Sequence, residues 1–131
     1  MNYRGAIIEE SLEDKSVLDG LKATLGAMQE VVTEKHRTPW VRQWTHRFVE
    51  IPREHASEFA TRLSKALDSK HAWYADFKSE TDHYIIFREK VFHIKDRTSK
   101  EQYDEATHYG LALGIPEYQL DFSPHIKQWH R

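Results

Sequence analysis

The chain has 131 residues with 19 basic and 21 acidic side chains, a formal net charge of −2 and no cysteine. One domain of this length, residues 1–131, can bury a core without cross-links, and the lack of cysteine excludes disulfides and thiolate metal ligands. The interspersed charges disfavour a nucleic-acid partner, and no stretch approaches the roughly 20 apolar residues of a membrane span. Because the start, MNYRGAIIEES, also lacks the features of a signal peptide, we expect a soluble, cytoplasmic protein with no membrane contact.

Residues 1–38 predict an N-terminal extension that packs on the sheet formed by the rest of the chain. Within it, YRGAIIEES at 3–11 predicts a short strand centred on its apolar residues. The following segment is ambiguous, because Gly20 and Gly26 interrupt a helical spacing of apolar residues and each costs a helix about 1 kcal/mol. We expect a short helix or turn near 14–22 and a strand near 23–33.

Residues 39–122 carry clearer signals and are expected to form the core of the fold. VRQWTHRFVEI, residues 41–51, alternates with a period of two and predicts a strand. Pro52 then opens a helix at its first position, where a missing N–H is harmless. The apolar stripe of that helix continues to Leu67.

HAWYADFKSETDHYIIF, residues 71–87, predicts two strands joined by a turn within 79–82. The polar residues that follow predict a second turn and a third strand at 91–95, although one bent strand from 83 to 95 is an alternative. With a two-residue second turn, the cross-strand pairs are Tyr84 with His93 and Ile85 with Phe92.

DRTSKEQ begins the next helix, because Thr98 with Glu101, or Ser99 with Gln102, forms a capping-box pattern. Gly114 ends this helix, in the order typical of helix C-termini. YQLDF at 118–122 then predicts a final strand. Residues 123–131 form a C-terminal tail, whose Trp129 either docks or is exposed.

The order of elements from residue 41 is strand, helix, strand, strand, helix, strand. This order predicts an α+β fold, a ferredoxin-like βαββαβ plait. The expected architecture is an antiparallel sheet with two helices on one face, an extra hairpin strand and the N-terminal extension. Such a plait leaves the other face of its sheet uncovered.

Both faces of the predicted hairpin are apolar. The more aliphatic face is expected to meet the helices, and consists of Ala72, Tyr74, Ile85, Phe87, Phe92 and Ile94. The opposite face consists of Trp73, Phe77, Tyr84, Ile86 and Val91. Leaving five such side chains in water would forgo on the order of 10 kcal/mol, similar to the stability of a whole domain. We therefore expect the N-terminal extension, a second copy of the chain in a homodimer, or a ligand to cover this face.

His46 alternates with Trp44 and Phe48 on a predicted strand, and His93 is expected opposite Tyr84. Both histidines are candidates for acid–base chemistry or for metal binding. Partly buried structural histidines are the alternative interpretation, and no third ligand is identifiable, so we predict neither a metal site nor a cofactor. The candidate ligand-binding residues are Trp44, His46, Trp73, Phe77, Tyr84 and His93. Asp76 and His83 are expected to pair across the hairpin as a surface ion pair.

TPWVRQWT (38–45), HAWYADFKS (71–79), HYIIFREKVF (83–92) and YGLALGIPEYQLDF (109–122) resemble a group of small prokaryotic proteins of about this length with no assigned activity. The resemblance covers nearly the whole chain. It implies a stand-alone domain and no catalytic residue.

The sequence carries no dinucleotide-binding, phosphate-loop, zinc-protease or nucleophile-elbow motif. The favoured hypothesis is therefore a small binding or regulatory module that holds an apolar or aromatic ligand or a partner protein on its sheet. One alternative is a small enzyme that uses His46 and His93 beside the aromatic residues. Another is an RNA-binding plait that stacks bases on sheet aromatics.

Overall fold

The computed structural model describes residues 2–20 and 24–124, so Trp129 and the end of the tail lie outside the described residues. The α-helices are α1 (Ala56–Ala66) and α2 (Lys100–Ala112). The strands are β1 (Tyr3–Ile8), β2 (Thr24–Val31), β3 (Gln43–Ile51), β4 (Tyr74–Lys78), β5 (His83–Phe87) and β6 (Lys90–Ile94). Short 3₁₀ turns occupy Glu9–Ser11, Lys15–Gly20, Glu34–His36, Arg53–His55 and Glu117–Gln119.

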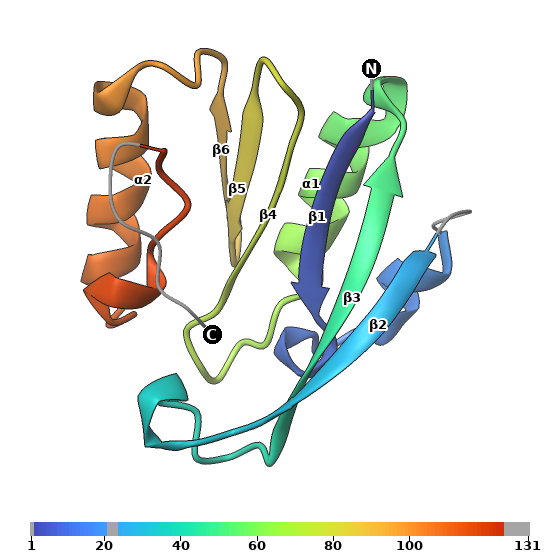
Figure 1. Ribbon diagram of the computed structural model, residues 1–131, viewed down its shortest axis with the longest axis vertical. Coiled ribbons are helices and arrows are strands. Elements are labelled where there is room, and N and C mark those ends of the chain that lie inside the picture. The colour runs from blue at the N-terminus through green and yellow to red at the C-terminus, as the bar shows by residue number, and fades with distance from the viewer. Residues whose placement is uncertain (1, 21–23, 125–131) are drawn as a thin grey trace.

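The six strands form one antiparallel sheet in the order β2-β3-β1-β4-β5-β6 (Figure 1). The fold is therefore α+β, but the ferredoxin-like plait order is not found. That order would place residues 118–122 at the edge of the sheet beside β3, but both neighbours of β3 are strands from the N-terminal part of the chain, β2 and β1. With both sides of β3 paired, the YQLDF segment forms a 3₁₀ turn followed by irregular chain, so the predicted final strand is wrong.

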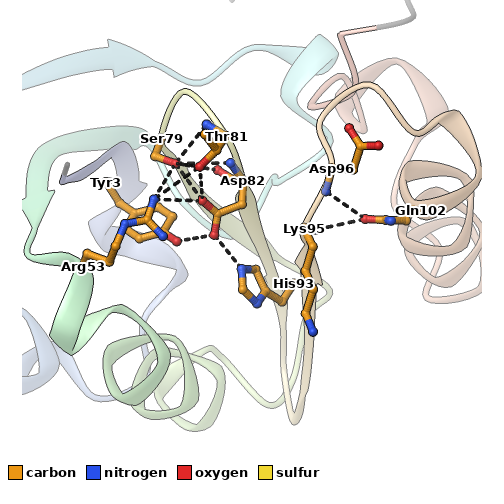
Figure 2. A network of polar contacts seen from close by, with 9 residues as sticks. All are labelled: Tyr3, Arg53, Ser79, Thr81, Asp82, His93, Lys95, Asp96 and Gln102. Atoms are coloured by element: carbon orange, nitrogen blue, oxygen red, sulfur yellow. Dashed lines mark hydrogen bonds and ion pairs between the residues drawn. The ribbon is translucent and has the colours of Figure 1, made fainter.

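Local signals located most elements correctly. Ser99 caps α2 by accepting a hydrogen bond from the backbone N–H of Gln102 at 3.4 Å. The side chain of Gln102 accepts hydrogen bonds from the backbone N–H groups of Lys95 and Asp96 at 2.9 and 3.2 Å (Figure 2). β6 is a strand of its own and not a continuation of β5, and the predicted pairs Tyr84 with His93 and Ile85 with Phe92 are confirmed.

The two helices cover opposite faces of the sheet, so the expectation that both lie on one face is wrong. Phe59 and Leu63 of α1 pack in one cluster with the side chains predicted to be uncovered, which include Trp73, Phe77, Tyr84 and Ile86. Tyr103 and Ala106 of α2 pack in a second cluster with Ile85, Phe87, Ile94, Leu120 and Phe122. Each helix carries one apolar stripe, and each stripe buries one of the two apolar faces of the hairpin. Neither a second copy nor a ligand is needed to cover these aromatic residues.

The N-terminal extension joins the sheet instead of only packing on it. β1 is a central strand, and β2 is an edge strand that pairs with β3. The segment expected near 14–22 is the 3₁₀ turn Lys15–Gly20, where Val17 and Leu18 pack into the core on the α1 side. In the described part of the chain, no helix is long and apolar enough to cross a membrane.

Candidate ligand-binding site

A cavity of about 600 Å³ lies on the face of the sheet that α2 covers only in part. Its floor is formed by side chains of β1, β3 and β4 that point to the same face, because they alternate along each strand. These floor residues are Arg4, Ala6, Ile8, Trp44, His46, Tyr74, Asp76 and Lys78. The walls come from the segments around residues 36–40, 71–73, 113–116 and 119–122. The volume lies within the roughly 300–1,000 Å³ typical of small-molecule sites.

Three of the four tryptophans of the chain meet at one end of this cavity. The ring centroid of Trp73 lies 5.9 Å from that of Trp44 and 6.0 Å from that of Trp40, both in edge-on geometry. Trp44 Nε1 donates a 3.0 Å hydrogen bond to Thr38 Oγ1, which fixes the indole. Trp40 stacks on the imidazole of His71 at 3.8 Å, and its own ring is exposed at the rim.

His46 lies on the cavity floor but is held by a carboxylate. Its Nε2 donates to Glu30 Oε1 at 3.1 Å, and His36 Nε2 lies 3.4 Å from the other oxygen of Glu30. His36 Nδ1 accepts a hydrogen bond from the backbone N–H of Thr33 at 2.9 Å. The proton of the neutral imidazole is therefore on Nε2, so neither ring nitrogen of His36 has a lone pair available to bind a metal. Among the described residues, no group of three or more His, Cys, Asp and Glu side chains is arranged to hold a metal ion.

Asp76 on the floor is backed by a buried hydrogen-bonded chain. Asp76 Oδ2 accepts from His83 Nε2 at 2.7 Å, and His83 Nδ1 accepts from the Tyr103 hydroxyl at 2.9 Å. The pairing of Asp76 with His83 was expected as a surface contact, but the His83 side chain is 0% exposed. Burial raises the pKa of the Tyr103 hydroxyl, which keeps it a donor to the imidazole. The hydrogen bonds that run from Tyr103 through His83 to Asp76 therefore fix the orientation of the Asp76 carboxylate at the cavity floor.

The structure divides the six predicted site residues between the two faces of the sheet. Trp44, His46 and Trp73 line the cavity, and the two indoles also belong to the buried cluster that α1 covers. The other three, Phe77, Tyr84 and His93, lie on the α1 face, where the rings of Phe77 and Tyr84 are 5.1 Å apart. His46 and His93 therefore do not share a surface, and the hypothesis that both imidazoles line one aromatic patch is wrong. The reason is the strand alternation, because β3 turns its Trp44 side away from α1.

His93 belongs to a second polar cluster, centred on Asp82 in the turn between β4 and β5 (Figure 2). Its Nε2 donates to Asp82 Oδ2 at 2.6 Å, and its ring stacks on Tyr84 at 4.1 Å. The Tyr3 hydroxyl donates to the same oxygen of Asp82, and Arg53 donates to the other oxygen at 3.0 Å. Asp82 thus links the start of β1, the 3₁₀ turn Arg53–His55 before α1, the β4–β5 turn and β6.

The electrostatics of this cluster favour an ionised carboxylate. Burial alone would raise the pKa of Asp82, but hydrogen bonds from Tyr3, His93, Thr81 and Ser79 outweigh it and hold the pKa well below its usual range. Burial and the bond to Asp82 raise the pKa of Tyr3 above its ordinary value. Sequence reasoning missed this cluster, because Tyr3 and Asp82 are 79 positions apart and no local spacing relates them.

Comparison with known proteins adds no assignment. No model of a known protein family matches the chain, and neither a curated protein nor a solved structure matches it. The resemblance to small prokaryotic proteins stays a prediction.

Proposed function

We propose that the protein is a small binding module that holds an apolar or aromatic ligand in the cavity of about 600 Å³. The observation that carries this proposal is the meeting of Trp40, Trp44 and Trp73 at one end of the cavity. Aromatic walls with a few oriented polar groups are the usual composition of a ligand site. The lack of cysteine fits a reducing compartment and supports placing this function in the cytoplasm.

The floor of the cavity explains how a flat ligand would be accommodated. Ala6 of β1 has the smallest side chain on the floor. In the register of the sheet, Ala6 lies opposite Phe48 and Asp76. Ile8 lies opposite His46, the floor residue next to Trp44. A planar ring would therefore extend over Ile8 to approach the tryptophans. Asp76, oriented by His83, would supply a fixed hydrogen-bond acceptor beside it.

Filling the floor is expected to weaken ligand binding without unfolding the protein. Ala6→Phe places a ring in the cavity, so we expect the affinity for the aromatic probe 8-anilinonaphthalene-1-sulfonate to fall by more than roughly tenfold, the effect of about 1.4 kcal/mol. Probe fluorescence excited through the tryptophans measures this, because three of the four line the cavity.

The control is Thr61→Phe, which adds the same ring at an exposed position of α1 on the other side of the sheet. This variant should bind the probe like the unmodified protein. Equal binding by both variants, with unchanged circular dichroism, would show that the probe does not occupy the cavity and would remove the support for the proposal.

The enzyme and RNA alternatives have less support from the geometry. The enzyme hypothesis needs His46 and His93 together, and they lie on opposite faces, each held by a carboxylate. The RNA hypothesis needs sheet aromatics open to bases, and α1 buries Phe77 and Tyr84.

A further inference from the structure

β2 is an exposed edge strand. Within the described residues, β2 pairs only with β3, so its outer backbone edge has no strand beside it. Val31 is 77% exposed and Met28 is 51% exposed, unusually high fractions for apolar side chains on a sheet. An exposed edge of this kind is a template for pairing with another strand.

The two edges of the sheet differ in how they are protected. β6 has five residues, and basic side chains lie in and beside it at Arg88, Lys90 and Lys95. Short length and lysines are devices that prevent edge-to-edge pairing. Between Gly26 and Val31, β2 contains no lysine, arginine or proline. Its only charged side chain in this stretch, Glu30, is engaged with His46.

The hydrogen bonds of the β2–β3 pair show which residues direct their backbone groups outward. Alternate residues of an antiparallel strand direct both N–H and C=O to the same neighbour. Just after β2, the N–H of Val32 donates to the C=O of Arg42 at 3.0 Å, so the even-numbered residues of β2 face β3. Ala27, Gln29 and Val31 therefore direct their backbone groups away from the sheet.

We propose that two copies of the chain associate edge to edge through β2, antiparallel, with a two-fold axis at Gln29. Within the regular part of the strand, this is the register in which all three outward-directed residues pair with one another. By symmetry, Ala27 of each copy lies opposite Val31 of the other. The two Ala27–Val31 pairs therefore cover Val31, the most exposed apolar side chain of β2. The same surface on both copies forms the interface, and the two sheets become one continuous sheet.

The occupant is a second copy because the edge is complementary to itself. Both members of the Ala27–Val31 pair are apolar, and the axis brings together two Gln29 side chains, whose amides can donate and accept in either direction. On the other face, Met28 of one copy lies opposite Glu30 of the other, so no pair of like charges meets.

The test is the association state of the full chain by sedimentation velocity, from micromolar to submillimolar concentration. We expect a concentration-dependent dimer. Gln29→Pro removes an outward N–H that β3 does not use and should give a monomer, whereas the control Gln29→Ala keeps that N–H and should still dimerise. A monomer at every concentration would overturn the proposal and leave the edge to a strand from another protein.

A pair of double variants tests the register and decides the matter if the proline variant does not fold. Ala27→Lys with Val31→Lys places like charges opposite one another at two points and should weaken association by roughly tenfold. Ala27→Lys with Val31→Glu changes the same positions but places opposite charges there, so association should be retained. Equal association of the two double variants, whether strong or weak, would overturn the proposed register.

Discussion

Asp82→Asn is expected to lower the free energy of unfolding by about 2–4 kcal/mol, a large part of the stability of a domain this size. The Asp82 side chain is 8% exposed, and its oxygens accept from Tyr3, His93, Arg53, Ser79 and Thr81. Asparagine keeps the shape but loses the charge and one acceptor position. Because Arg53 and His93 are partly exposed, the expected loss is smaller than for a fully buried ion pair.

Urea unfolding at neutral pH measures this loss, as a lower midpoint with an unchanged slope. The control is Asp96→Asn, an exposed carboxylate that caps the backbone at Thr98 and should cost no more than about 1 kcal/mol. Tyr3→Phe removes one donor from Asp82 and should fall between the two. If Asp82→Asn costs no more than Asp96→Asn, the cluster does not hold the fold together.

The same variant has a pH signature. The pKa of Asp82 in the folded protein lies below its ordinary value of 3.8, so the unfolded chain takes up the proton more readily. The stabilisation is therefore complete above a pH of about 5 and is lost as the pH falls through the unfolded value towards the folded one. The difference in unfolding free energy between the unmodified protein and Asp82→Asn should be constant near neutral pH and should shrink below a pH of about 4.

Gly5→Ala is expected to cost about 3 kcal/mol or more, because β1 and β4 approach most closely at this residue. A Cβ atom on Gly5 would lie 2.4 Å from the carbonyl oxygen of Asp76 and 2.9 Å from Cα of Phe77. Both obstacles belong to the main chain or are fixed to it, so relief requires the two central strands to separate. Thermal or urea unfolding measures the loss.

Gly110→Ala is the matched control. A Cβ atom there would lie 2.6 Å from a terminal methyl group of Leu120, which can rotate away. Alanine also improves the helix propensity of α2 by about 1 kcal/mol, which offsets part of the clash. We expect Gly110→Ala to be the milder change, and the reverse order of stabilities would contradict the close approach of β1 and β4.

Sequence periodicity located most strands and both helices, but not which strands distant in the sequence lie side by side. The alternation in residues 41–51 and the capping residues of α2 are local signals, and the structure confirms them. The alternation in YQLDF is just as clear, yet Leu120 and Phe122 are buried in a segment without regular secondary structure, because β1 and β2 already pair with both sides of β3. Which strand fills the centre of a sheet depends on pairings across 38 to 74 positions, and no local pattern encodes them.

The candidate site was predicted in part for the same reason. The sequence showed correctly that the hairpin has two apolar faces, but not that α1 and α2 would each cover one. Trp44, His46 and Trp73 were identified as candidates and do meet at the cavity. The walls contributed by residues 113–116 and 119–122 were missed, because the segment after α2 was assigned to a strand.

The position of β1 has a consequence for how the protein is synthesised. Residues 3–8 leave the ribosome well before residues 43–51 and 74–78, between which they must lie. Until residues 43–51 emerge, the strand at 3–8 has both edges unpaired, and one edge stays unpaired until residues 74–78 emerge. Such long-range closure slows folding and prolongs the interval in which the chain is prone to aggregate. This protein should therefore depend more on chaperones during translation than a helical chain of equal length.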